Sequence, residues 1–409
     1  MKPCLCGAVF VLAFSLFFNP SPSFSEEPIK IGFIYVFSGR LQNFGQMARH
    51  GAQQAIEEVN DSGGVLGRKV VVLYEDEQMN PKRGVEVARK LVNDDKVDVL
   101  MGITSSGVAD AVVPVIPDLR TPLIITLAMN PDVTGQKCNP YTFRVSMNGP
   151  QNIMAGAMLA SGLPVKRWTT IGPDYLFGYQ CWEYFQEYLR PKRPDVTFVP
   201  RTDVSFAPIT TTDYTPYIRK TIDSKADGVL ISLFAGNLVD FLKQALSQGL
   251  FGKDRQVLVN IGCSIDVMYG LGLDMPKGIW IGGFYWFEQN QTPANMKFVE
   301  AYHRKYKFPP DYNAHGAYAG VKAYVAAVEK AGTTDKESVR KALEGLVIDL
   351  PIGRTVIRAG DHQAVSDAAW GSTSEFSGKF RLRLLEPLRI FPGVEITMPV
   401  EQTGCKNAR

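Results

Sequence analysis

The chain has 409 residues, of which 45% are hydrophobic and 21% are charged, so it can bury a large core. Its 44 basic and 41 acidic residues nearly balance, and they form no basic stripe that would favour nucleic acid as a partner. No segment beyond the amino-terminal leader has the roughly 18 unbroken apolar residues of a membrane span.

Residues 1–25 predict a signal peptide that is removed on export to the periplasm. Lys2 supplies a positive start, the apolar run from Val9 to Phe18 is too short to span a bilayer, and Ser23-Phe24-Ser25 is typical of a cleavage site. After cleavage, four cysteines remain, and in an oxidising compartment they allow three disulfide pairings: these are Cys138, Cys181, Cys263 and Cys405. Their spacing and that of the histidines match no metal site, so we expect no metal and no cofactor.

The first part of the chain alternates predicted strands and helices with short connections. This alternation predicts an α/β fold with a parallel, doubly wound sheet. The expected strands are 29–36, 69–74, 97–103 and 122–125, and the expected helices cover 47–59, 85–92 and 108–115.

The third of these strands ends in a run of small hydroxyl residues. Thr104, Ser105 and Ser106 precede Gly107 and a helical pattern, at the carboxyl end of a buried parallel strand. Backbone N–H groups and hydroxyls that converge there favour a cradle for an anion or a carboxylate. The alternative is that Ser106 only caps the helix.

The pattern then repeats, which predicts a second α/β unit. The expected strands are 168–171, 196–199, 228–232 and 257–261, and the expected helices are 178–189, 214–224 and 238–247. Beyond this unit, two long amphipathic helices are expected at 298–306 and 316–331 and a shorter one at 338–346. The last 60 or so residues lack helical periodicity and favour strand and loop.

A set of short motifs is spread over nearly the whole mature chain: Ile29-Lys30-Ile31-Gly32, Ser38-Gly39, Phe44-Gly45-Gln46, the run from Gly51 to Asn60, Gly63-Gly64-Val65-Leu66-Gly67-Arg68, Asp76, Lys96 to Gly102, Tyr141-Thr142-Phe143-Arg144 and Gly278 to Gly283. These motifs resemble those of the extracellular solute-binding proteins of branched-chain amino-acid ABC transporters, which have the type I periplasmic binding protein fold. The family binds amino acids, amides, urea and aromatic or other carboxylates.

This resemblance implies two Rossmann-like lobes that are joined by three crossovers and close on a ligand like a hinge. We expect residues 28–147 and 287–347 in the amino-terminal lobe, 148–286 and 348–395 in the carboxy-terminal lobe, and 396–409 as a tail.

The resemblance also implies a carboxylate site. In amino-acid binders of the family a serine of the first-lobe turn holds the carboxylate, and Ser105 or Ser106 matches it, with Thr104 beside them. An aromatic residue that covers the ligand falls at Phe177, close to Tyr175.

The residues expected to hold an α-ammonium group are largely missing. Met129, in the same loop as Leu127, stands where a threonine is expected, and Asn237 replaces a second aromatic residue. The acid of the second lobe would fall near Ser264, but no carboxylate occurs before Asp266. An unpaired cation in a closed cleft costs several kcal/mol, so a plain aliphatic α-amino acid is disfavoured as the ligand.

Other residues could line the cleft or belong to the core. Trp286 and Tyr285 are aromatic candidates for the cleft, and His315 could donate to a carboxylate or be structural. Asp361-His362-Gln363 matches a family turn near the third crossover, and we interpret it as structural. No nucleophile elbow, Walker loop or dinucleotide fingerprint is present, so we expect no enzyme activity.

The sequence therefore predicts a monomeric periplasmic protein that delivers a small carboxylate-bearing ligand, amino acid-like or aromatic, to the permease of an ABC importer. The alternatives are a ligand-sensing module of a receptor or regulator with the same fold, and a secreted hydrolase. With the hinge placed by the resemblance, Cys138 and Cys405 both fall near it, which predicts a disulfide between them. Cys181 and Cys263 would remain as free thiols or form a second bridge.

Overall fold

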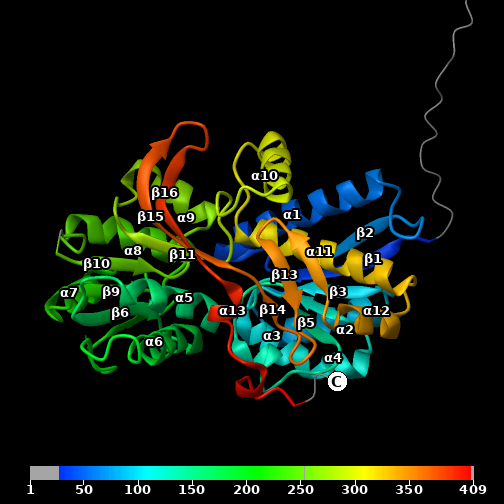
Figure 1. The fold of residues 1–409 in the computed structure, drawn as a ribbon, viewed down its shortest axis with the longest axis horizontal. Helices are drawn as coiled ribbons and strands as arrows, with labels where there is room; N and C mark the ends of the chain where they lie inside the picture. The colour runs from blue at the N-terminus through cyan, green and yellow to red at the C-terminus, as the bar shows by residue number, and fades with distance from the viewer. Residues whose placement is uncertain (1–26, 253, 407–409) are drawn as a thin grey trace, which may run out of the picture.

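The computed structural model describes residues 27–252 and 254–406, so the predicted signal peptide lies outside the described residues. Two large sheets lie side by side, each flanked by helices, as Figure 1 shows. We call the five-stranded sheet with its helices the first lobe and the eight-stranded sheet with its helices the second lobe. The predicted α/β fold with two Rossmann-like lobes is confirmed.

The first sheet is entirely parallel, with strand order β2-β1-β3-β4-β5. Its central strands are buried on both faces, as the short apolar runs of the sequence predict. The strands are β1 (Ile29–Tyr35), β2 (Val70–Asp76), β3 (Val99–Gly102), β4 (Leu123–Ile125) and β5 (Thr142–Arg144).

Helices cover both faces of this sheet. The amphipathic helix α1 (Gln42–Asp61) packs against α11 (Tyr312–Ala331) so closely that a Cβ on Gly51 would lie 1.9 Å from the Ala314 carbonyl oxygen. On the other face, α2 (Pro81–Asn93) packs against α3 (Ser106–Val112). The remaining helices associated with the first lobe are α4 (Ile116–Leu119), α10 (Pro293–Tyr306) and α12 (Lys336–Leu343).

The second sheet repeats the parallel pattern and extends it with an antiparallel hairpin. Its order is β16-β15-β11-β10-β9-β6-β7, and β8 also pairs with β6. In Figure 1 the long hairpin β15–β16 runs up the side of the second lobe. The strands are β6 (Arg167–Pro173), β7 (Thr197–Phe198), β8 (Ser205–Ala207), β9 (Gly228–Ile231), β10 (Gln256–Val259), β11 (Trp280–Gly283), β15 (Ala368–Ser377) and β16 (Leu382–Phe391).

The helices of the second lobe include one that the sequence reading missed. The helix α5 (Gly149–Ser161) is buried almost all round, so its apolar residues show little periodicity. Its start is nevertheless marked by a capping box between Asn148 and Gln151. The other helices are α6 (Leu176–Leu189), α7 (Thr215–Asp223), α8 (Ala235–Ser247), α9 (Ile265–Leu271) and α13 (Gly393–Ile396).

The chain passes between the two large sheets three times: after β5, after β11 and before β15. A third, small sheet precedes the last passage and consists of β12 (Val347–Leu350), β13 (Gly353–Ile357) and β14 (Ala364–Val365). β12 packs against α10 and α11. The lobe boundary predicted at residue 348 falls within the first strand of this sheet.

The predicted disulfide between Cys138 and Cys405 is present, with its Cα atoms 5.5 Å apart. It ties the carboxy-terminal tail to the loop before β5, where the Thr403 carbonyl oxygen lies close to Gly135. Cys181 and Cys263 are buried free thiols, so the alternative of a second bridge is wrong.

Candidate ligand-binding site

A cavity of about 330 Å³ lies between the two lobes, at the ends of their parallel strands. On the side of the first sheet, the cavity lies beyond the carboxyl ends of β1 and β3. The strand order reverses between these two strands, and α/β proteins bind ligands at such a point. Its apolar wall consists of Leu41, Phe44, Met79, Leu127, Met129, Tyr175, Phe177, Ile209, Phe234, Ile261 and Tyr312. Its other lining residues are Arg40, Thr104, Ser105, Ser106, Gly107 and Asn237.

The backbone after β3 brings the hydroxyl residues to this cavity. Gly102 has φ +113°, and a Cβ there would lie 2.1 Å from the Ile34 carbonyl oxygen, so this position requires glycine. Ile103 follows with φ 66°, an unusual conformation for a β-branched residue. The chain then turns through Thr104 and Ser105 into α3. We call Thr104–Ser106 the hydroxyl turn.

The hydroxyl turn has a partner that the sequence reading did not foresee. The Glu77 carboxylate accepts hydrogen bonds from the N–H groups of Thr104, at 3.3 Å, and Ser105, at 3.0 Å. Glu77 is fully buried, and burial raises its pKa to about 8. Two of the N–H groups expected to form the cradle therefore already donate to a carboxyl group of the protein itself, and the cradle stays a prediction for the remaining donors.

Other donors of the turn remain on the cavity side. The Thr104 hydroxyl is not one of them, because it accepts from Val36 N–H at 3.0 Å and also hydrogen-bonds Glu77. The Ser106 hydroxyl accepts from Met129 N–H at 3.3 Å, which leaves its proton available. The N–H groups of Ser106 and Gly107 begin α3, where a helix supplies them no partner. Together with the Ser105 hydroxyl, they can hold one carboxylate.

The second lobe supplies an aromatic wall. Phe177 and Phe234 meet edge to face, with ring centroids 6.0 Å apart, and Tyr175 lies 6.1 Å from Phe177. Asn237 also lines the cavity, but its amide nitrogen donates to the Ile209 carbonyl and the Tyr214 hydroxyl.

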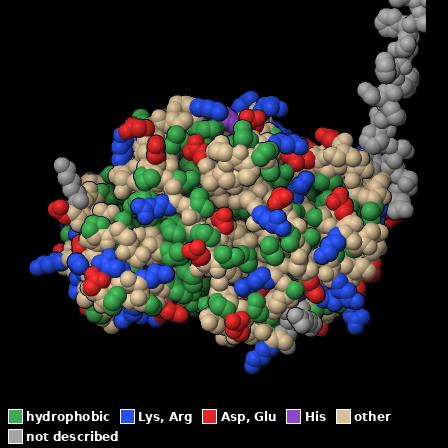
Figure 2. Space-filling model, in the orientation of Figure 1, with side chains coloured by type: hydrophobic (Ala, Val, Ile, Leu, Met, Phe, Trp, Pro, Cys, Tyr) green, Lys and Arg blue, Asp and Glu red, His purple; other side chains and the backbone are tan. Residues whose placement is uncertain are grey.

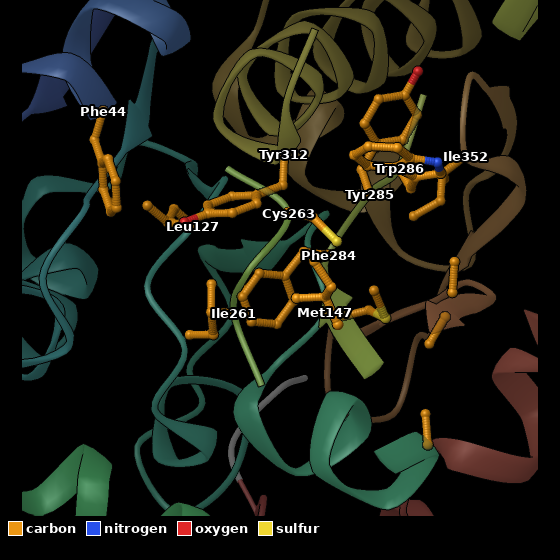
Figure 3. Packing of buried hydrophobic residues seen from close by; sticks show 14 of the residues in the cluster. Phe44, Leu127, Met147, Ile261, Cys263, Phe284, Tyr285, Trp286, Tyr312 and Ile352 are labelled. Atoms are coloured by element: carbon orange, nitrogen blue, oxygen red, sulfur yellow. The ribbon is translucent and has the colours of Figure 1, made fainter. Parts of the chain in front are cut away.

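The structure brings most of the predicted site residues together, although their contact with a ligand stays a prediction. Eight line the cavity: Thr104, Ser105, Ser106, Leu127, Met129, Tyr175, Phe177 and Asn237. Trp286 and Ser264 are not among the lining residues. Trp286 is 2% exposed and packs on Phe287, and Figure 3 shows it beside Tyr285 and Ile352, away from Phe44 and Ile261. Ser264 is buried at the start of α9.

The next carboxylate after Ser264, Asp266, lines a neighbouring crevice of about 410 Å³ instead. There it lies beside Asp311, whose carboxylate also faces the Ile265 N–H across the two lobes at 3.4 Å. Burial raises the pKa of Asp311 to about 6 and also raises that of Asp266. Among the described residues that line the main cavity, therefore, none is acidic.

A family model described as periplasmic binding protein matches residues 28–374. The chain belongs to the periplasmic binding protein family. This confirms the resemblance to the solute-binding proteins of branched-chain amino-acid ABC transporters, a family that acts outside the cytoplasm.

Two curated relatives of this periplasmic binding protein are named for amino acids. One is a Leu/Ile/Val-binding protein homolog of Brucella melitensis, 26% identical over 81% of this chain and 88% of its own. The other is a leucine-, isoleucine-, valine-, threonine- and alanine-binding protein of Pseudomonas aeruginosa, 25% identical over 81% of this chain and 86% of its own.

Solved structures share the fold. An amino-acid ABC transporter substrate-binding protein from Pseudomonas fluorescens has a TM-score of 0.83 at 25% identity, covering 94% of this chain and all of its own. A solute-binding protein from Rhodopseudomonas palustris in complex with 3,4-dihydroxybenzoic acid has a TM-score of 0.77 at 23% identity, covering 90% of this chain and 98% of its own.

Two other candidates are structural in this binding protein. His315 is 4% exposed, stacks on Tyr285 at 4.4 Å, and has its pKa lowered to about 3 by burial. In the third crossover Asp361 pairs with Arg358, His362 stacks on Phe143, and Gln363 accepts from Arg144. The structural interpretation of 361–363 is confirmed.

Several lining residues were missed by sequence reasoning. Ile261 is the last residue of a predicted strand of the second lobe and Phe234 lies two residues beyond another, so the rule that ligands lie at strand ends could have found them. Arg40 lies in the loop after the first strand, where a single arginine does not by itself indicate a ligand-binding residue. Tyr312 reaches the cavity from the start of α11, far along the chain, and no local pattern indicates this.

Surface charge, helix composition and the grouping of possible metal ligands add three observations. On the face in Figure 2, basic and acidic side chains are interspersed, with no large field of one sign. In the part of the chain that the structure describes, no helix combines the length and apolar character needed to cross a bilayer. Within the same residues, no cluster of three or more histidine, cysteine or acidic side chains could hold a metal ion.

Proposed function

We propose that this periplasmic binding protein carries a small carboxylate with an apolar or aromatic body to an ABC importer. The observation that carries the proposal is the cavity: hydroxyl and N–H donors at one end, a largely apolar wall, and no acid among its described lining residues. A carboxylate gains charge-assisted hydrogen bonds at the hydroxyl turn, whereas an α-ammonium group would lose its water without a counter-charge.

The structural neighbours agree with a ligand of this class. Relatives from Rhodopseudomonas palustris carry 3,4-dihydroxybenzoic acid and p-hydroxybenzoic acid, but at 23% identity their likeness establishes the fold alone. The proposal for this chain therefore depends on its own cavity.

In the proposed mechanism the acid group binds first to Ser105 and Ser106 on the first lobe. Closure then brings Tyr175, Phe177 and Phe234 of the second lobe over the body of the ligand and removes apolar surface from water. The permease would recognise the closed pair of lobes of a monomer, and the ligand would leave unchanged, since the described residues that line the cavity include no pair of nucleophile and base.

A thermal-shift screen of the mature protein tests the proposal. The panel contains benzoate, 4-hydroxybenzoate and 4-methylpentanoate, with benzamide and leucine as matched ligands that lack a carboxylate or add an ammonium group. A ligand at 100 times its Kd adds about 2.7 kcal/mol to the free energy of unfolding. Stronger stabilisation by an acid than by benzamide supports the proposal, and no stabilisation by any acid contradicts it.

A ligand-sensing role on the same fold is the alternative. Co-purification of the protein with permease subunits, in the presence of the acid found in the screen, separates a transport role from a sensing role.

A further inference from the structure

Glu77 is a buried carboxylate directly behind the polar end of the cavity. It follows β2, and its own N–H donates to the Tyr35 carbonyl at 2.9 Å, which fixes it beneath the hydroxyl turn. Its two oxygens hold two successive N–H groups of that turn, at Thr104 and Ser105. Ser105 therefore both lines the cavity and contacts Glu77, to which its backbone N–H donates.

A carboxylate ligand on the same turn would bring a second negative charge next to Glu77. Two like charges a few ångströms apart in a buried site repel strongly, and one of them then keeps a proton. The charged groups around Glu77 do not cancel this repulsion. Tyr35 on β1 and Asp76 on β2 face it, Arg83 of α2 balances Asp76, and Asp311 acts on Tyr35. Residues 104–109 of the turn and α3 carry no titratable side chain.

We propose that Glu77 is a positioning residue that takes up one proton when a carboxylate ligand binds to the hydroxyl turn. This inference rests on the proposed function. The proton passes from solvent to a carboxylate oxygen of Glu77, which becomes a neutral carboxylic acid, and no bond of the ligand changes. The carbonyl oxygen of that acid still accepts a hydrogen bond from the turn, so the Ser105 and Ser106 hydroxyls stay in place.

The proton uptake has a definite pH dependence. Because burial already raises the pKa of Glu77 to about 8, the residue is mostly neutral below about pH 7 and no uptake accompanies binding there. Above about pH 8 the empty protein carries the charge, and binding must neutralise it. The Kd for an acid then rises by up to about tenfold per pH unit, the limit for one linked proton.

Calorimetry of the mature protein in buffers with different ionisation enthalpies counts the protons directly. The probes are benzoate, 4-hydroxybenzoate and 4-methylpentanoate at about pH 6 and about pH 8.5. We expect uptake of between about half a proton and one proton at the higher pH and almost none at the lower pH. Benzamide, a neutral ligand of the same shape as benzoate, should bind without uptake at either pH.

Two variants test whether Glu77 is the residue that takes up the proton. Glu77→Gln should abolish the uptake and make the Kd for the acid equal at both pH values, whereas a purely structural role would weaken binding equally at both. Glu75→Gln is the matched control: it removes a charge from the same strand, where Glu75 pairs with Arg83 and Lys90 outside the site. This control should keep the uptake.

Other results overturn the inference. Binding of an acid to the wild type without uptake at about pH 8.5 contradicts it while leaving the proposed function intact. Uptake that persists in Glu77→Gln, or uptake in the wild type centred near pH 6, would assign the proton to Asp311 and its neighbour Asp266 instead. If no acid of the panel binds at about pH 6, the proposed function itself fails. The wild-type measurement decides the matter even if Glu77→Gln does not fold.

Discussion

The two lobes present different chemistry to the same cavity. The first lobe contributes the donors of the hydroxyl turn and the cation Arg40, and it also contributes apolar side chains: Leu41, Phe44, Met79, Leu127, Met129 and Tyr312. The second lobe contributes rings and aliphatic groups, Tyr175, Phe177, Ile209, Phe234 and Ile261, and among the described lining residues its polar member is Asn237. The proposed ligand would place its acid group against the first lobe and its apolar body against both lobes.

The largest expected effect concerns the α-ammonium group of an amino acid, for which neither wall supplies an acidic partner. Leucine, isoleucine and valine should bind at least several kcal/mol more weakly than 4-methylpentanoate, which is leucine without its amino group, because their ammonium group finds no acid and faces Arg40. Calorimetry with the four ligands measures this. Sub-micromolar binding of any of the three amino acids would contradict it, and Asp266→Asn would then show whether the neighbouring crevice supplies the missing charge.

Removal of the aromatic wall should have the next largest effect. The double substitution Phe177→Ala and Phe234→Ala removes two packed rings, and we expect benzoate to bind about 2–4 kcal/mol more weakly. Phe234→Leu, which keeps apolar volume, is the matched variant and should lose much less. Equal affinity of the double variant and the wild type would show that the second lobe does not cover the ligand.

The polar end should contribute somewhat less. Ser105→Ala with Ser106→Ala should weaken binding of an acid by about 1–3 kcal/mol, the range for lost hydrogen bonds to a charged group, and leave benzamide less affected. Ser264→Ala is the matched control, because Ser264 also precedes a helix after a strand but lies outside the lining. Unchanged affinity in the double variant would refute the carboxylate site, and a loss in the control would restore Ser264 to it.

The contrast between the walls also shows what the sequence could predict. Ser105 lies in the turn after a buried strand and could be assigned because α/β proteins bind ligands beyond the ends of parallel strands, whereas Phe177 was assigned through the resemblance to the family. Trp286 is equally aromatic and close to a strand end, but the crossover after β11 turns it into the core. Such a turn depends on packing between segments distant in sequence, which local patterns do not encode.

Glu77 illustrates the second limit of sequence reasoning. Its own segment resembles an ordinary exposed acidic turn, Glu75-Asp76-Glu77, and only the first of these residues forms surface ion pairs. The pairing of β1 with β2 and β3 brings the third beneath the hydroxyl turn. The α/β pattern predicted a parallel sheet, but it did not predict which carboxylate would face the turn.

The smallest expected effect tests the contact between the two walls themselves. Arg40 of the first lobe lies 3.3 Å from Asp240 of the second, and both side chains are about half exposed. An exposed pair of this kind contributes about 0–1 kcal/mol, so Asp240→Asn should weaken binding of benzoate only a few-fold, by favouring the open lobes. Salt should erase the difference, since the Debye length falls to about 3 Å at 1 M. Calorimetry of both proteins at low and high salt measures it. A loss of more than tenfold that persists in salt would mean that Asp240 holds Arg40 in place against the ligand, and that the cation of the first lobe, not only its hydroxyl turn, binds the acid.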